Sequence, residues 1–318
     1  MIGLVVVSGL GLLCLPTLIR PLGRRLRPDW WAALCLAALA AGSALVLFGG
    51  VATSISTVFR AIGLPTVARA CDAMLGHLVP AGSPLAMLVI LVTGSVLILA
   101  SRSLLRTRRI VRKGWVEPGI GLRLRRHGEI EVIALDTEHP RAFSVPRSRS
   151  RAAQIVVTRG LVEALSPEEF HLVCAHEASH LHFGHSRWLA FVSALERGLW
   201  FFPPTRLSCA ALRLALERWA DESAAGEAPE RRARLGDALV AMATDHRRPV
   251  LAAFSSLDGL VERLTAMSEP AGATLRTTWW PALVVPGLLL GGVAVVALAH
   301  LGHGAFCLLS MPHSCSLR

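Results

Sequence analysis

Two histidines and a glutamate within residues 166–185 have the types and spacing of a metal site. His176 and His180 are four residues apart in the sequence HEASH, and Glu177 follows the first of them. Residues four apart on a helix leave the same face about one turn apart, so both imidazoles can share one ion. Zn²⁺ accepts imidazole and carboxylate ligands, and a catalytic site keeps one position for water. The pattern predicts His176 and His180 as zinc ligands and Glu177 as a general base.

The sequence also delimits the helix that carries this motif. Ser166 suits the N-cap, Pro167 suits the first helical position, and Glu169 can return a hydrogen bond to the cap. We therefore expect the helix to begin at about residue 167. Until a further ligand is found, a chance match in a core helix with solvated histidines is the alternative.

A second helix, predicted over 208–226, offers the third ligand. Glu217 and Asp221 lie four apart on one face of this Ala- and Leu-rich segment, which ends at the plausible C-cap Gly226. Glu217 can complete a His-His-Glu shell, and Asp221 can accept the other ring N–H of a ligand histidine. The alternative is a solvated acidic face on which Glu217 pairs with Arg213.

The pair HEASH and ERWAD resembles the HExxH and ExxxD motifs of the gluzincin membrane metallopeptidases, which include HtpX/Ste24-type proteases and BlaR/MecR-type regulators. Segments 155–161 and 165–169 are similar to the strand, turn and helix start that precede the motif there. The resemblance covers about 115–270. It implies a Zn²⁺ cofactor ligated by His176, His180 and Glu217.

Composition and charge placement predict a membrane protein. The chain has 318 residues, 53% of them hydrophobic and 17% charged, and its mean hydropathy of +0.52 exceeds that of ordinary soluble domains. The formal net charge is +11. Arginines that flank apolar stretches orient a membrane protein more often than they bind nucleic acid, so we expect a lipid bilayer as partner and no direct nucleic-acid binding.

Four uncharged stretches are expected to cross the membrane, at about 2–19, 32–50, 84–101 and 282–299. Arginines follow the first stretch and six cations follow the third, which places those ends in the cytoplasm and both chain termini outside. The predicted fold is mainly α. Three transmembrane helices in 1–114 precede a cytosolic α+β gluzincin zinc-peptidase domain in 115–278, which is inserted between the third and fourth spans. The fourth transmembrane helix is in 279–301, and an extracytoplasmic tail follows in 302–318. The loop 51–82, expected outside, carries some amphipathic helix.

Within the predicted domain, residues 130–135 and 154–158 are β-like, and 140–146 are predicted as a short edge strand. An extended substrate could pair with such an edge. Two further helices are expected over 229–246 and 256–268.

Two chemical questions stay open. The seven cysteines show no metal-ligand spacing, although Cys307 and Cys315 could form a disulfide in the predicted tail.

Tyrosine is absent from the chain, so the remaining candidates for stabilising an oxyanion are His185, Arg231, Arg232 and His246. His185 is also a less economical alternative to Glu217 as a ligand.

The order of three spans before the motif and one after it is similar to BlaR/MecR-type regulators and differs from HtpX-type proteases, which have two spans before it. Only about 17 residues follow the last predicted span, too few for the penicillin-binding sensor of the regulators. The resemblance implies cleavage of a cytosolic BlaI-like repressor. The alternatives are an HtpX-like quality-control protease of membrane proteins and a non-catalytic zinc-containing sensor or scaffold, which would have no need of Glu177 as a base.

Overall fold

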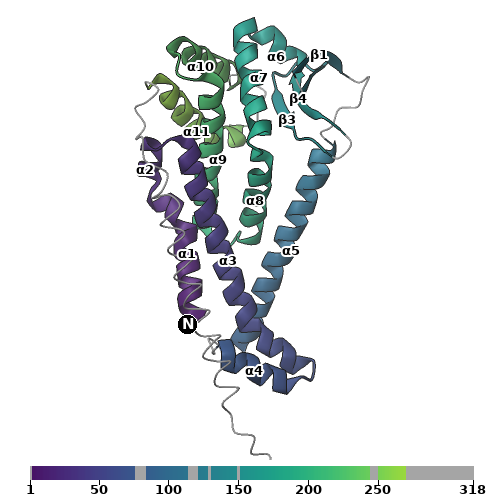
Figure 1. Cartoon of the computed structure of the whole chain (residues 1–318), viewed down its shortest axis with the longest axis vertical. Coiled ribbons are helices and arrows are strands. Elements are labelled where there is room, and N and C mark those ends of the chain that lie inside the picture. Colours follow the sequence, from purple (N-terminus) through teal and green to yellow (C-terminus); the bar gives the residue numbers. More distant parts are fainter. Residues whose placement is uncertain are drawn as a thin grey trace, which may run out of the picture.

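The computed structural model describes residues 2–75, 84–113, 121–127, 130–148, 151–243 and 250–269. Within them the fold is mainly helical with one small sheet (Figure 1). The helices are α1 (Ile2–Leu18), α2 (Arg20–Arg25), α3 (Pro28–Ala61), α4 (Pro65–Leu75), α5 (Pro84–Lys113), α6 (Arg159–Ala164), α7 (Pro167–His182), α8 (His185–Gly198), α9 (Pro203–Ala225), α10 (Pro229–Ala243) and α11 (Val250–Ser268). The predicted fourth span, Cys307, Cys315 and His246 lie outside the described residues.

The sheet has four strands in the order β1-β2-β4-β3: β1 (Leu122–His127), β2 (Ile130–Leu135), β4 (Ala153–Thr158) and β3 (Ala142–Val145). β2 and β4 are parallel, and each has an antiparallel neighbour on its outer side. The predicted strands at 130–135 and 154–158 are confirmed, and β3 is the edge strand predicted within 140–146. β1 was not predicted.

The first predicted span agrees with α1 to within one residue, and the second and third lie within α3 and α5. By length and composition, Pro28–Ala61 and Ala86–Ile110 are long and apolar enough to cross a membrane, and Val5–Leu18 is a shorter apolar helix. α3 continues beyond the predicted stretch to Ala61, and α4 folds back against it, so much of the expected outside loop is helical. In Figure 1, α3 and α5 lie close together near α4 and diverge from there, α5 toward the sheet and α3 toward α2.

The helical hairpin α8–α9 packs between these diverging helices (Figure 1). Leu212 and Cys209 of α9 share a buried apolar cluster with Leu13 of α1 and Leu39 of α3. The turn between α8 and α9 exposes Trp200 and Phe201, by 65% and 50%. The hairpin therefore shares its core with the apolar helices α1, α3 and α5, whereas the sheet and α7 pack in a separate buried cluster.

α1 and α3 cross closely at two glycines. A Cβ on Gly9 would lie 2.9 Å from the carbonyl oxygen of Gly42, and a Cβ on Gly42 would lie 2.7 Å from the carbonyl oxygen of Gly9. Small residues permit such close backbone approach between apolar helices. The crossing therefore has no room for a side chain at either position.

We expect Gly9→Val to separate α1 from α3 and to destabilise the protein by roughly 1–3 kcal/mol through overpacking. Gly11→Val is the matched control, because a Cβ at Gly11 meets nothing within 4 Å. Thermal unfolding of both variants in detergent tests the expectation. Equal melting temperatures for the two variants would contradict it.

Candidate metal centre

α7 begins where the sequence predicts. The hydroxyl of Ser166 accepts a hydrogen bond from the backbone N–H of Glu169 (3.3 Å), whose carboxylate accepts one from the N–H of Ser166 (2.7 Å). This reciprocal pair satisfies two otherwise unpaired donors at the helix start. α9 begins at Pro203, earlier than the predicted residue 208, and ends before Gly226, whose φ of 67° favours glycine.

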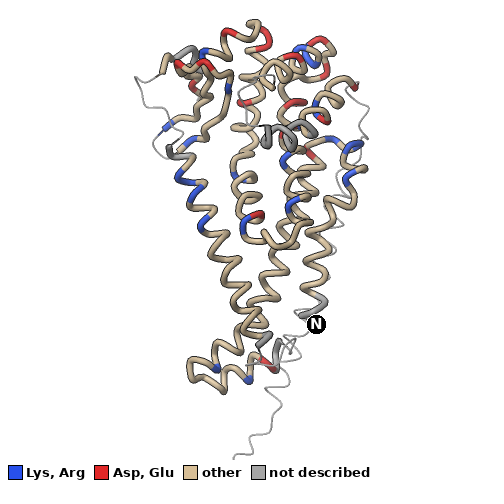
Figure 2. Tube along the Cα trace, turned by 180° about the vertical axis from the view of Figure 1, so that it is seen from behind, with Lys and Arg blue, Asp and Glu red and all other residues tan. Residues whose placement is uncertain are grey.

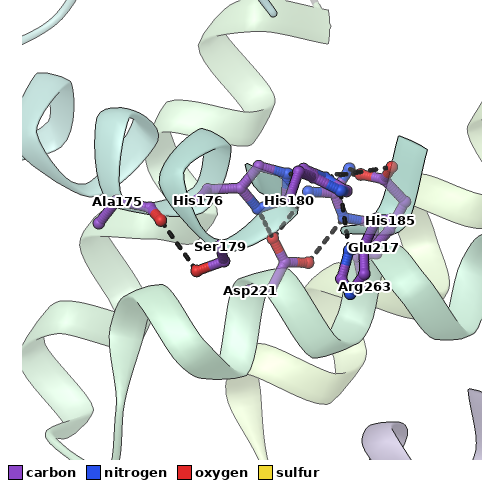
Figure 3. Close-up of polar contacts among 8 residues, drawn as sticks. All are labelled: Ala175, His176, Ser179, His180, His185, Glu217, Asp221 and Arg263. Atoms are coloured by element: carbon purple, nitrogen blue, oxygen red, sulfur yellow. Dashed lines mark hydrogen bonds and ion pairs between the residues drawn. The ribbon is translucent and has the colours of Figure 1, made fainter. Parts of the chain in front are cut away.

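α7 and α9 pack together and bring His176, His180 and Glu217 to one point (Figure 3). The two Nε2 atoms are 3.1 Å apart, and the carboxylate oxygens of Glu217 lie 3.5 Å from His176 Nε2 and 3.6 Å from His180 Nε2. Ligand atoms about 2.0–2.1 Å from a tetrahedral zinc ion are about 3.3 Å from one another. These three side chains could therefore hold a zinc ion.

The candidate site is open on one side. The side chains of His176 and His180 are each 10% exposed, whereas that of Glu217 is 34% exposed. Water and substrate can therefore approach past Glu217. Arg213, the alternative partner of Glu217, instead forms an ion pair with Glu196 of α8 (2.7 Å), which excludes the predicted alternative of a Glu217–Arg213 pair.

Asp221 lies behind His176 and is fully buried. Its Oδ1 is 2.9 Å from His176 Nδ1, so it is placed to orient that ring with Nε2 toward Glu217. Arg263 of α11 donates two hydrogen bonds of 2.7 Å to Asp221, and its Nη1 is 3.2 Å from Glu217. Sequence reasoning missed Arg263, because no spacing relates α11 to either motif.

The neighbour of Arg263 contacts α2, the short helix that follows the first apolar helix. Glu262 accepts hydrogen bonds from Arg20 (3.0 Å) and Arg24 (3.5 Å) of α2, at the end of α1 nearest the metal site. Consecutive residues of α11 therefore contact the α1–α2 junction and the candidate site.

His185 supports the second histidine. Its ring is fully buried, its Nδ1 is 2.9 Å from His180 Nδ1, and it packs against the rings of Phe183 and Trp219. This contact leaves His180 Nε2 directed at the shared point. His185 thus lies behind a ligand, which contradicts its proposed roles as oxyanion donor or substitute ligand.

Two other oxyanion candidates are engaged elsewhere. Arg231 donates to the carbonyl of Ala224 (2.8 Å). Arg232 is buried and donates to Glu222 (2.8 Å) and to the carbonyl of Ala266 (2.6 Å). Both side chains link α10 to neighbouring helices, so neither serves the metal centre.

Burial and neighbouring charges give the two histidines opposite protonation in the metal-free site. Burial lowers the pKa of His180 to about 4, so this ring is neutral. Burial also lowers the pKa of His176, but Asp221 and Glu217 outweigh it and raise that pKa to about 10. Burial tends to raise the pKa of Glu217, but His176 and Arg263 lower it to about 2.

Glu177 lies on α7 beside the edge strand. Burial raises its pKa, and its carboxylate is hydrogen-bonded to Ser144 of β3. A carboxylate whose pKa moves toward neutrality is better suited to accept and return a proton. The exposed edge of the sheet and the candidate base are therefore adjacent.

We predict that His185→Ala weakens zinc binding by roughly 10–100-fold, since His180 loses the group that orients it. His182→Ala is the control, because His182 is exposed in the same turn. Competition with a chelating zinc indicator gives the two affinities. Unchanged affinity in the first variant would show that His185 does not orient the ligand.

Zinc uptake at pH 7.5 is expected to release about one proton from His176, because a metal ligand must be neutral and the pKa of this ring is about 10 in the metal-free site. Affinity should therefore rise as pH rises. Calorimetry in buffers of different ionisation enthalpy measures the proton count. Release of no proton would contradict the protonation of His176.

Comparison with known protein families supports a metallopeptidase. Residues 119–211 match the model for Peptidase family M48. The matched range includes the sheet, α7 and α8 but ends before Glu217, so the third ligand position is supported by the geometry. No solved structure matches the chain significantly. The family match supports an M48-type metallopeptidase and does not separate BlaR/MecR-type from HtpX-type proteins.

Proposed function

We propose that this protein is a membrane-embedded, zinc-dependent endopeptidase. The observation that carries the proposal is the convergence of His176, His180 and Glu217, with Glu177 on the same helix as both histidines. A structural zinc site has no need of a neighbouring base, whereas hydrolysis of a peptide bond does. The match to Peptidase family M48 supports the same reaction.

Each of the surrounding residues has a distinct role in the proposal. When bound by His176, His180 and Glu217, zinc supplies a Lewis acid that polarises a carbonyl and lowers the pKa of water to about 7. Glu177 takes the proton of the attacking water and passes it to the leaving amine. Asp221 and His185 each orient one of the two histidines.

The proposed substrate binds in extended form along β3. This strand is at the edge of the sheet and its Ser144 is hydrogen-bonded to Glu177. Pairing of a substrate backbone with β3 would bring a peptide bond next to the base. The same arrangement accepts many sequences, because main-chain groups make the pairing.

We further propose that the site faces the cytoplasm and that the substrate is a BlaI-like repressor. The support for this orientation is the gathering of basic residues on α2 and on the sheet-facing end of α5, the end nearest the metal site (Figure 2). The support for the substrate is the order of predicted spans, with three before the motif. Cleavage of damaged membrane proteins is the competing substrate class.

Glu177→Gln should reduce casein cleavage by at least about a hundredfold and leave zinc content unchanged, because it removes the base and no ligand. Glu168→Gln, at the start of the same helix, is the control. Metal analysis and peptide release are measured on both purified variants. Full cleavage by the first variant would refute the mechanism, and bound zinc without any cleavage by the wild type would favour a scaffold.

The substrate class is tested in cells that express either the wild type or Glu177→Gln. Loss of one folded cytosolic repressor and induction of its genes, in wild-type cells only, is the expected result. Loss of many unfolded membrane proteins instead would establish the quality-control alternative.

A further inference from the structure

A cavity of about 650 Å³ lies between α5 and the first turn of α8. Three arginines line it: Arg108 and Arg109 from α5 and Arg187 from α8. All three are exposed and have no acidic partner among the residues that the structure describes. The rest of the wall includes Leu104, Leu105 and Ala190. None of the described residues that line the cavity is acidic, so its described wall combines an apolar surface with a concentrated positive charge.

This combination fits an amphiphilic anion. Guanidinium groups bind phosphate oxygens through paired hydrogen bonds, and an apolar wall accommodates the hydrocarbon attached to a phosphodiester. A free inorganic anion would use the arginines and leave Leu104 and Leu105 in contact with water. Leu105 is 53% exposed and Leu104 is 40% exposed, so both offer apolar contact area.

The cavity begins at the level along α5 where lipid headgroups are expected. The uncharged stretch of α5 ends at about residue 101, and the lining residues of α5 follow it by three to eight positions. At 1.5 Å per residue, the cavity begins roughly 5 Å beyond the apolar stretch and ends roughly 12 Å beyond it. The polar headgroup layer extends about 5–7 Å from the hydrocarbon core, so the end of the cavity nearest the apolar stretch lies within it.

We propose that this cavity binds the headgroup of an acidic phospholipid, such as phosphatidylglycerol, through Arg108, Arg109 and Arg187. The inference rests on the membrane location proposed above and not on the proposed peptidase activity. Ser186 also lines the cavity and directly follows His185, which contacts His180. The bound headgroup therefore stabilises the turn of α8 that holds one metal ligand in position.

Binding is tested with the full chain carrying Glu177→Gln, purified with zinc in detergent, so that peptidase activity plays no part in the readout. Short-chain phosphatidylglycerol is compared with phosphatidylcholine of the same chains and with inorganic phosphate. We expect phosphatidylglycerol to bind more tightly than either. Replacing both Arg108 and Arg187 by Gln should weaken its binding about thirtyfold.

The matched control replaces Arg102 and Arg106 by Gln. These arginines are exposed on α5 and lie outside the cavity, and the control removes the same charge. It should weaken binding less than about threefold. Zinc content reports on folding. The Arg108→Lys and Arg187→Lys double variant should bind more tightly than the Gln variant because it keeps the charge, and less tightly than the wild type because it loses the paired hydrogen bonds.

Three results would overturn the proposal. Equal losses in both Gln double variants would show a general surface charge, and equal affinity for phosphate and phosphatidylglycerol would show a free-anion site. Preference for an acidic peptide over phosphatidylglycerol would assign the cavity to substrate. A protein that binds phosphatidylglycerol as expected but cleaves no substrate would refute only the proposed peptidase function.

Discussion

The buried carboxylate of Asp221 is the charge on which the arrangement of the candidate metal centre depends. An ionised carboxylate in a protein interior is costly unless partners surround it. Asp221 has two, Arg263 from α11 and His176 from α7. Three helices must therefore be packed together before this group can be ionised, and the same contacts aim His176 at Glu217. Interhelical packing and ligand geometry are stabilised by one side chain.

The two histidines of the candidate site reach their ligand geometry by different means. Both rings lie near Glu217, but the ring of His176 also faces Asp221, whereas the ring of His180 faces His185, which packs in an apolar surrounding of Phe183 and Trp219. The acidic surrounding favours a charged ring and the apolar surrounding favours a neutral one. Before zinc binds, the proton is therefore on the ring of His176, next to Asp221.

Much of the fold and part of the site could be predicted from the sequence, since the signals are local. The cap at Ser166, the i,i+4 spacing of His176 and His180 and the apolar run of β2 each lie within a few residues. The placement of Glu217 beside the histidines followed from a known pairing of motifs. These features need no knowledge of tertiary contacts.

The missed features depend on contacts between distant segments. Arg263 reaches Asp221 across 42 positions of sequence, and no periodicity in α11 marks it. His185 was placed at the helix end, but its burial against Trp219 depends on the packing of α8 on α9. β1 contains four charged or titratable side chains in LRLRRH, and its pairing with β2 rather than its own composition makes it a strand.

Glu262 and Arg263 are neighbours in α11, and they contact different parts of the protein. Glu262 accepts hydrogen bonds from Arg20 and Arg24 where the first apolar helix ends, and Arg263 donates to Asp221 beside the histidine. A sliding or rotation of α1 that pulls on Glu262 would thus act on a guanidinium one residue away. One peptide unit therefore separates the residue that contacts α2 from the residue that holds Asp221.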